Sequence, residues 1–152
     1  MKVLYSDQPP YEYDYEYNET ESTRPKSCFL VGPSPRSAEV PSWRPQALEI
    51  LAATNYNGTV LVPEPSNGGR FPAYDNQITW EYQGLNKCDA IVAWVPRCMK
   101  TMLALTTNVE FGYWLAKAPE KLYYGRPDGA PHTAYLDWMY QKKKKKAPIN
   151  NL

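Results

Sequence analysis

Lys87-Cys-Asp-Ala-Ile-Val-Ala-Trp-Val-Pro-Arg97 is the stretch of sequence that decides the fold. It contains an apolar run between Asp89 and Pro96, and this run has the length and the isoleucine and valine content of a strand buried on both faces. Strands of this kind occur in parallel sheets whose two faces are covered by helices. The stretch therefore predicts a central strand of an α/β fold.

The next stretch, Thr106-Thr-Asn-Val-Glu-Phe-Gly-Tyr-Trp-Leu-Ala116, has the pattern of a helix. Its first residues carry hydroxyl and amide groups suited to capping, and Val109, Tyr113 and Ala116 fall on one helical face. Glu110 then lies in the first turn, just beyond the predicted strand. Open parallel sheets bind ligands outside the carboxyl ends of their strands, so Glu110 is the first residue to consider for a functional role.

Strands and helices alternate along the rest of the chain. Short apolar runs that end at glycine, proline or a turn signal predict strands, and longer stretches with helical spacing predict helices. The predicted strands are 28–32, 59–62, 90–95 and 121–124, and the predicted helices are 43–54, 74–87, 106–116 and 132–140. This order implies parallel strands joined by right-handed crossovers, which is an α/β three-layer sandwich.

The two ends of the chain differ from this domain in composition. In residues 1–27, tyrosines alternate with acidic residues and aliphatic residues are scarce, so we expect an extension that is loosely ordered or laid over a neighbouring surface. At the other end, Lys142–Lys146 is a run of like charges, which is typical of a solvated tail. The expected organisation is an extension over 1–27, one domain over 28–141 and a lysine-rich tail over 142–152.

Composition limits the classes of function. The chain has 152 residues and a net charge of +1, which fits one domain without a broad field for nucleic acid or an anionic membrane. It has no apolar run near the roughly 18 residues of a membrane span, and no secretory signal pattern. Its three cysteines form no C-x-x-C pair and favour a reduced, cytoplasmic protein. With His132 as the single histidine, we expect no metal and no organic cofactor, and acid–base chemistry falls mainly to carboxylates.

Polar side chains collect where the predicted strands end. Gly32, Ser34 and Arg36 follow the strand at 28–32. Carboxylates bind sugar hydroxyls, whereas arginine forks and backbone amides bind phosphate, and glycine allows close backbone approach. This edge therefore suits a sugar that carries hydroxyl or phosphate groups. The residues contributed by the later segments are Glu64, Arg97 and Glu110.

Two carboxylates without a metal or a histidine are best suited to chemistry at an anomeric carbon. One carboxylate acts as nucleophile or stabilises an oxocarbenium-like centre, and the other donates a proton to the leaving group. Glu110 is the candidate for the first role. The proton donor needs a raised pKa, which burial beside Trp80 would give to Glu81, the candidate for the second role.

Each of these residues also has a purely structural explanation. A glutamate in a first helical turn, such as Glu110, interacts favourably with the helix dipole, and Asp89 before a strand commonly accepts structural hydrogen bonds. Glu81 can be a surface residue, and arginines at a rim can pair with nearby acids. Trp43 and Trp80 are also candidates for contacts with the substrate, although tryptophans at these spacings are more often core residues than a stacking platform for a base.

The ordered set of short motifs resembles the nucleoside 2-deoxyribosyltransferase-like family. The similarity covers roughly residues 28–128, and the set as a whole is more specific than any single motif. The motifs are Phe29-Leu-Val-Gly-Pro33, Ser42-Trp-Arg-Pro45, Val62-Pro-Glu64, Trp80-Glu81, Cys88-Asp-Ala-Ile-Val-Ala-Trp-Val-Pro-Arg97 and Leu105-Thr-Thr-Asn-Val-Glu-Phe-Gly112.

The resemblance implies a flavodoxin-like fold, with a five-stranded parallel sheet between helices, and assembly into dimers or larger oligomers. It implies that Glu110 attacks C1′ of a 2′-deoxynucleoside and that Glu81, eight residues before Asp89, protonates the departing base. Gly32 and the adjoining Pro33 then lie beside the sugar, and Asp89 orients the sugar end. The implied partners are a nucleoside or nucleotide and a free nucleobase, with no membrane and with nucleic acid disfavoured.

One departure from the family pattern, and one resemblance to its hydrolytic members, leave the exact activity open. The classical transferases carry a sugar-binding aspartate where this chain has Ala104, so Thr107 or Asn108 is expected to take part of that role. Relatives that hydrolyse deoxynucleoside 5′-monophosphates carry a serine and arginine loop, which Ser34 and Arg36 resemble loosely. The alternatives are base exchange, monophosphate hydrolysis, and a non-catalytic module that binds nucleotides in the same pocket.

Overall fold

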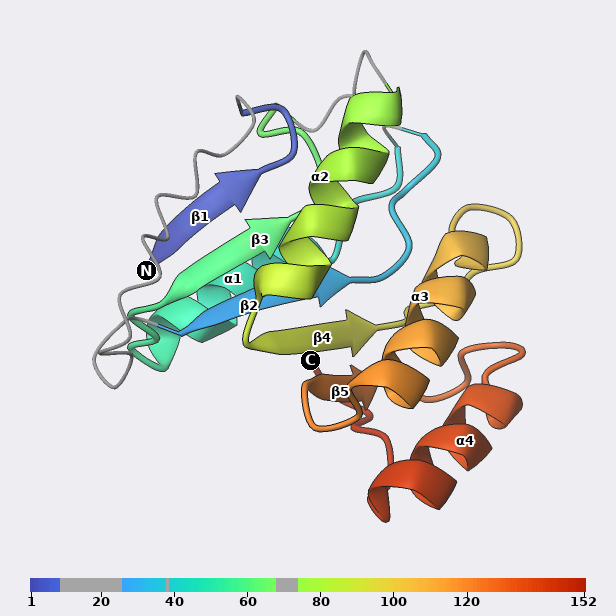
Figure 1. The fold of residues 1–152 in the computed structure, drawn as a ribbon. Helices are drawn as coiled ribbons and strands as arrows, with labels where there is room; N and C mark the ends of the chain where they lie inside the picture. The colour runs from blue at the N-terminus through green and yellow to red at the C-terminus, as the bar shows by residue number, and fades with distance from the viewer. Residues whose placement is uncertain (9–25, 38, 68–73) are drawn as a thin grey trace.

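The computed structural model describes residues 1–8, 26–37, 39–67 and 74–152, which form one five-stranded parallel sheet with helices on both faces (Figure 1). The strand order is β1-β3-β2-β4-β5, and every neighbouring pair is parallel. This arrangement is flavodoxin-like and confirms the predicted fold class. The strands are β1 (Lys2–Tyr5), β2 (Ser27–Val31), β3 (Thr59–Val62), β4 (Ala90–Trp94) and β5 (Leu122–Gly125), and the helices are α1 (Arg44–Ala53), α2 (Tyr74–Lys87), α3 (Leu105–Lys117) and α4 (Ala134–Lys144).

Strand β2 shows why the centre of the sheet is buried on both sides. All five of its residues are buried, and its four apolar side chains alternate between two clusters. Phe29 and Val31 join the cluster under α2, α3 and α4, whereas Cys28 and Leu30 join the cluster under α1. Figure 1 shows α1 behind the sheet and α2 and α3 in front of it. The helices therefore form the two outer layers of the predicted three-layer sandwich.

The fifth strand comes from the segment that was expected to be an extension. Lys2–Tyr5 forms β1, which pairs with β3 in the register Lys2↔Thr59 to Tyr5↔Val62. The prediction of an extension over 1–27 is therefore wrong for these residues, while 9–25 lie outside the described residues. The pattern was hard to read because an edge strand is held mainly by backbone pairing, and only Leu4 of β1 is buried.

The lysine run is also part of the folded structure at its start. Helix α4 continues through Lys144, whose ammonium group donates to the carbonyl of Pro119. Beyond the helix, Ile149 donates to the Tyr124 carbonyl at 3.1 Å and accepts from the Arg126 amide at 2.8 Å. The chain after 141 is thus not simply a solvated tail, because it lies along the outer side of β5. Across the described ranges, no helix combines the length and the apolar character that a membrane span requires.

Helix α3 begins and packs differently from the prediction. It starts at Leu105, after Ala104 in a left-handed conformation, and no side chain caps it. Glu110 is the sixth residue and lies in the second turn rather than the first. The expected face of Val109, Tyr113 and Ala116 is exposed. The sheet decides which face is buried, and the buried residues are Thr107, Phe111, Trp114 and Leu115.

Candidate active site

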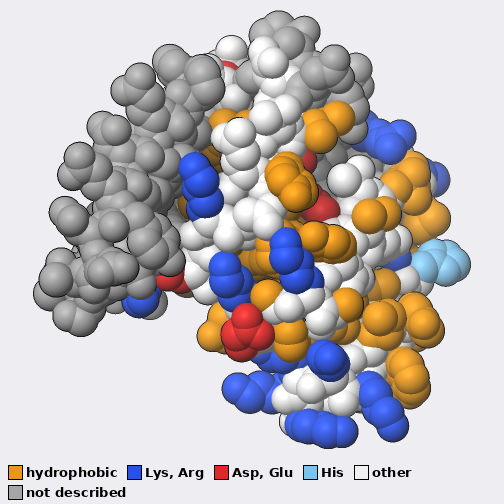
Figure 2. Space-filling model, viewed as in Figure 1, with side chains coloured by type: hydrophobic (Ala, Val, Ile, Leu, Met, Phe, Trp, Pro, Cys, Tyr) orange, Lys and Arg blue, Asp and Glu red, His pale blue; other side chains and the backbone are white. Residues whose placement is uncertain are grey.

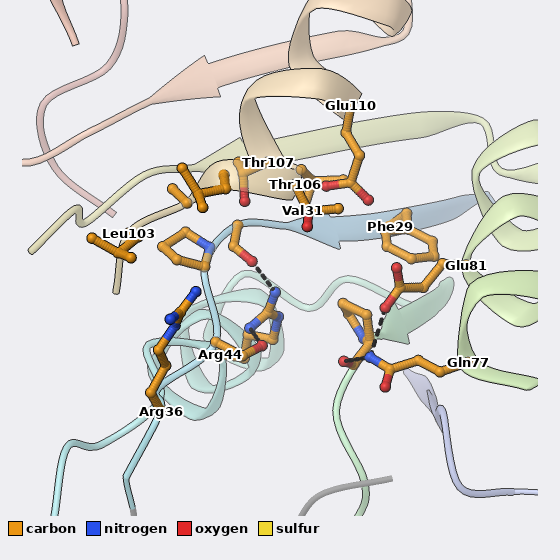
Figure 3. Close-up of a pocket in the computed structure, with 16 residues that line it drawn as sticks. Phe29, Val31, Arg36, Arg44, Gln77, Glu81, Leu103, Thr106, Thr107 and Glu110 are labelled. Carbon is orange, nitrogen blue, oxygen red and sulfur yellow. Dashed lines mark hydrogen bonds between the residues drawn. The ribbon is translucent and has the colours of Figure 1, made fainter. Parts of the chain in front are cut away.

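A cavity of about 200 Å³ opens at the carboxyl edge of the sheet, above the end of β2 (Figure 3). The chain leaves β2 for α1 on one face, and it leaves β3 and β4 for helices on the other face. The strand order reverses beside β2, and a crevice forms at such a point in an open parallel sheet. Six predicted site residues line this cavity: Gly32, Pro33, Ser34, Arg36, Glu81 and Glu110.

Glu110 reaches the cavity from α3, and its carboxylate points into the space (Figure 3). Burial raises the pKa of Glu110 to about 8; the charge of Glu81 adds to the rise, and Arg44 acts against it. A carboxylate with this pKa changes its charge close to neutral pH, as groups in active sites often do. Glu110 can therefore exchange between its protonated and ionised forms near neutral pH.

Glu81 enters the same cavity from α2, the neighbouring helix (Figure 3). Burial raises its pKa, whereas the hydrogen bond from Gln77 and the charge of Arg44 lower it. The Gln77 amide donates to Glu81 at 2.8 Å and to the Pro63 carbonyl at 3.4 Å, so it holds the carboxylate in place. Two carboxyl groups whose neutral forms are favoured by burial thus share one cavity, and such a pair can divide the roles of acid and nucleophile.

Gly32 shapes the wall of the cavity because no side chain fits at this position. A Cβ atom there would lie 2.2 Å from the Trp94 carbonyl oxygen and 2.7 Å from the ring of Trp43. The Trp43 indole N–H in turn donates to the Pro33 carbonyl at 3.2 Å. Trp43 therefore supports the cavity wall from behind and is absent from the cavity lining among the described residues.

Arg44 is the main residue of the site that the sequence analysis missed. It is 1% exposed, and its guanidinium group donates to four acceptors. Nε donates to the Leu30 carbonyl at 3.2 Å and Nη2 to the Gly32 carbonyl at 2.7 Å. Nη1 donates to the Ser34 hydroxyl at 3.1 Å and to the Glu64 carboxylate at 2.6 Å. Arg44 thus ties the loop after β2 to the end of β3.

This arrangement gives Glu64 a different role from the one predicted. Its second carboxylate oxygen accepts a hydrogen bond from the Ser42 hydroxyl at 2.8 Å, and its first pairs with Arg44. Glu64 does not line the cavity, so the prediction of a substrate contact is replaced by support of Arg44. The signal for Arg44 was present in the Ser42-Trp-Arg-Pro45 motif, but an arginine at a helix start is usually read as a surface residue.

Asp89 lies at the amino-terminal ends of the strands, opposite the cavity. Its carboxylate accepts hydrogen bonds from the Ser27 amide at 2.8 Å and the Ser27 hydroxyl at 3.0 Å, and Lys26 lies 3.7 Å away. These contacts join the amino-terminal ends of β2 and β4, whereas the cavity is at their carboxyl ends. The prediction that Asp89 orients a sugar in this cavity is therefore wrong, and its structural explanation holds.

Three further predicted contacts also lie away from the cavity lining. Arg97 donates to the His132 carbonyl at 2.5 Å and to the Asn108 side-chain oxygen. Arg97 and Asn108 therefore bind each other. Trp80 is buried and packs on Phe29, with ring centroids 5.6 Å apart. Arg97, Asn108 and Trp80 are absent from the described lining.

The opposite side of the cavity comes from the start of α3 and the loop before it. Ala104 and Thr107 both line the cavity, so of the two side chains expected to replace the family's aspartate only Thr107 is in place. The side chain of Arg36 is exposed at the cavity wall, and its backbone amide donates to the Thr101 carbonyl at 3.3 Å. Within the described ranges, no group of three His, Cys, Asp or Glu side chains is arranged to hold a metal ion.

A family model covers the part of the chain that contains this cavity. The model described as "Nucleoside 2-deoxyribosyltransferase like" matches residues 25–128, more than half of the chain and the whole span from Phe29 to Glu110 that lines the cavity. A search among curated proteins finds no match. The matched range, with the fold and the order of its motifs, shows that the chain belongs to the nucleoside 2-deoxyribosyltransferase-like family.

Proposed function

We propose that the protein cleaves or exchanges the N-glycosidic bond of 2′-deoxynucleosides, with Glu110 as nucleophile and Glu81 as general acid. One observation carries this proposal: the two carboxyl groups enter a single cavity from α2 and α3, and burial raises the pKa of Glu81, the proposed proton donor. Membership of a family that handles nucleosides supports the substrate class.

The reaction needs one carboxylate ionised and the other protonated. Ionised Glu110 attacks C1′ of the deoxyribose while the C1′–N bond breaks, and the bonding electrons leave with the base nitrogen. Protonated Glu81 gives its proton to the base, which departs as the neutral molecule. A deoxyribosyl ester of Glu110 remains. A second base, or water, then attacks C1′, releases the carboxylate and returns a proton to Glu81.

A second candidate function is the hydrolysis of a 2′-deoxynucleoside 5′-monophosphate. The exposed guanidinium of Arg36 and the hydroxyl of Ser34 both line the cavity wall, where they could meet a phosphate group. The third candidate is a non-catalytic module that binds nucleotides, because Ala104 occupies the place of the family's aspartate.

An exchange assay separates these candidates. Purified protein is incubated with deoxyinosine plus adenine and, separately, with each deoxynucleoside monophosphate, and the products are resolved by chromatography. Deoxyadenosine or free hypoxanthine supports the nucleoside activity, and free base from a monophosphate alone supports the hydrolase. Binding seen by thermal shift without any product supports the non-catalytic module.

The matched variants are Glu110→Ala, Glu110→Gln and, as a control on the other face of the sheet, Glu49→Gln in α1. Glu49 is exposed and belongs to the helix behind the sheet, so its variant should keep the wild-type rate. Glu110→Ala should abolish base release without unfolding the protein. Glu110→Gln should still bind nucleoside. Near-normal turnover by Glu110→Ala would contradict the proposed nucleophile.

We further propose that the protein acts as a homo-oligomer in the cytoplasm. Figure 2 shows hydrophobic side chains on the face that α2 and α3 present. On α3, Leu105 is 64% and Val109 71% exposed, which is typical of a surface that a second copy covers. Sedimentation of the wild type and of Val109→Glu tests this, because the variant should shift to monomer. The free thiols of Cys28, Cys88 and Cys98 support a reducing compartment.

A further inference from the structure

Arg44 is buried, so its position cannot be explained as that of an ordinary solvent-exposed arginine. Its guanidinium is buried in the cavity wall, and the buried Trp43 ring lies beside it, with the centroid 4.8 Å from Cζ. A buried guanidinium is costly unless its N–H groups are bonded and its charge is balanced. Three of its nitrogens have partners at 2.6–3.2 Å, so the cost is offset by a built arrangement.

Two of these bonds fix backbone carbonyls in and next to the cavity wall. Nη2 holds the Gly32 carbonyl, and Nε holds the Leu30 carbonyl at the end of β2. Nη1 holds the Ser34 hydroxyl, so both ends of the Gly32–Ser34 segment are bound to one group (Figure 3). The position of this cavity wall therefore depends on Arg44.

The charge of Arg44 also faces the carboxylates of the cavity. Its ion-pair partner is Glu64, at the end of β3, at 2.6 Å. Glu81 from α2 and Glu110 from α3 line the same cavity as Arg44, and the only other cation in the described lining is Arg36, which is exposed. Arg44 lowers the pKa of both Glu110 and Glu81 against the effect of burial. The buried positive charge thus favours the anionic form of Glu110, whereas at Glu81 it adds to the larger effect of the hydrogen bond from Gln77.

We propose that Arg44 is a positioning residue for the reaction: it holds the Gly32–Ser34 wall in place, and its buried charge stabilises the anionic form of Glu110 that attacks the sugar. This inference rests on the proposed function. It also gives Glu64 a defined part, because the negative charge of Glu64 balances Arg44 and limits how strongly Arg44 acts on Glu110.

The two partners therefore predict effects of opposite sign. Arg44→Gln removes the positive charge, so the midpoint of Glu110 ionisation should move up by about one pH unit. Glu64→Gln keeps Arg44 and removes the charge that balances it, so the midpoint should move down. Arg44→Lys keeps a positive charge without the planar fork, so the midpoint should stay near the wild type while KM rises because the wall is held less firmly.

Carboxyl-carbon NMR of the whole chain, labelled with ¹³C in glutamate, measures this midpoint without any turnover. The Glu110 signal is identified by its loss in Glu110→Gln, and thermal melts show which variants are folded. The proposal is overturned if folded Arg44→Gln titrates like the wild type, or if Glu64→Gln moves the midpoint in the same direction as Arg44→Gln. If Arg44→Gln does not fold, the downward shift in Glu64→Gln decides, and its absence overturns the proposal.

Base release by the same variants then tests the link to catalysis. The lower pH limb of kcat should follow the NMR midpoint, upward in Arg44→Gln and downward in Glu64→Gln. A limb that stays fixed while the midpoint moves overturns the positioning role. If the wild type releases no base, the proposed function fails, and the NMR midpoints alone still decide whether Arg44 controls the charge of Glu110.

Discussion

Replacing Glu110 by glutamine should stabilise the protein above neutral pH while removing its activity. Burial raises the pKa of Glu110 from 4.5 to about 8 in the folded state. The folded protein therefore binds this proton more tightly than the unfolded chain does. The corresponding stability is fully present below pH 4.5 and is lost as the pH rises through 8. Glutamine resembles the protonated carboxyl group and has no such loss.

The magnitude follows from the pKa difference. One pKa unit corresponds to about 1.4 kcal/mol, so the wild type should lose about 3 kcal/mol between pH 4.5 and pH 7, and about 4 kcal/mol by pH 8. For a domain of about 150 residues, each kcal/mol moves Tm by about 2–4 °C. At pH 8, Glu110→Gln should therefore melt about 10 °C above the wild type, whereas at pH 4.5 the two should nearly coincide.

Thermal melts followed by circular dichroism at pH 4.5, 6, 7 and 8 measure the difference directly. Glu49→Gln, an exposed substitution on α1, is the matched control and should follow the wild type at every pH. Parallel wild-type and Glu110→Gln curves from pH 4.5 to 8 would falsify the claim that burial holds the proton on Glu110. A glutamine variant that is less stable at pH 8 would do the same.

Three further substitutions test the rest of the site. Glu81→Gln should slow the release of a natural base by a factor of about 10²–10⁴, and it should not slow cleavage of a deoxyriboside whose leaving group needs no proton. Equal losses of rate on both substrates would show that Glu81 is not the general acid. Gly32→Ala places a Cβ 2.2 Å from the Trp94 carbonyl oxygen and should lower the free energy of unfolding by about 1–3 kcal/mol. Gly112→Ala, where an added Cβ has no atom within 4 Å, should not lower it. Similar thermal melts for the two variants would contradict the close packing at Gly32. Arg36→Ala should raise KM for deoxynucleoside monophosphates and leave KM for nucleosides unchanged, and an equal change for both would show that Arg36 does not bind phosphate.

The centre of the fold could be predicted because its signals are continuous. The apolar run of β4 is buried on one face and partly buried on the other, and it is bounded by residues that end a strand; β2 and β3 are similar apolar runs. The two candidate carboxylates could be predicted from two general rules. Parallel sheets bind ligands at the carboxyl ends of their strands, and a pair of carboxylates suits chemistry at an anomeric carbon. Glu81 and Glu110 could be assigned to this end of the sheet without knowledge of side-chain contacts, because the ranges of α2 and α3 were predicted to within one residue, although the turn of α3 that holds Glu110 was not.

The remaining features depend on contacts that no local pattern contains. Strand β1 is short and is held by β3, which comes much later in the chain. The buried face of α3 is chosen by the sheet, and Val109 and Tyr113 match the buried face in spacing although they are exposed. Arg44 became visible only when its acceptors, from Leu30 to Glu64, came together in space.

The position of β1 at the margin of the sheet sets an order in which the structure comes apart. Because β1 pairs with β3 rather than with its neighbour in the chain, it can dock only after a long loop has closed, and it has one strand to hold it. Its amide protons should exchange with solvent through local openings well before those of β2 and β4 do. Fraying thus begins at β1, and the cavity at the end of β2 keeps its walls while β1 detaches from β3.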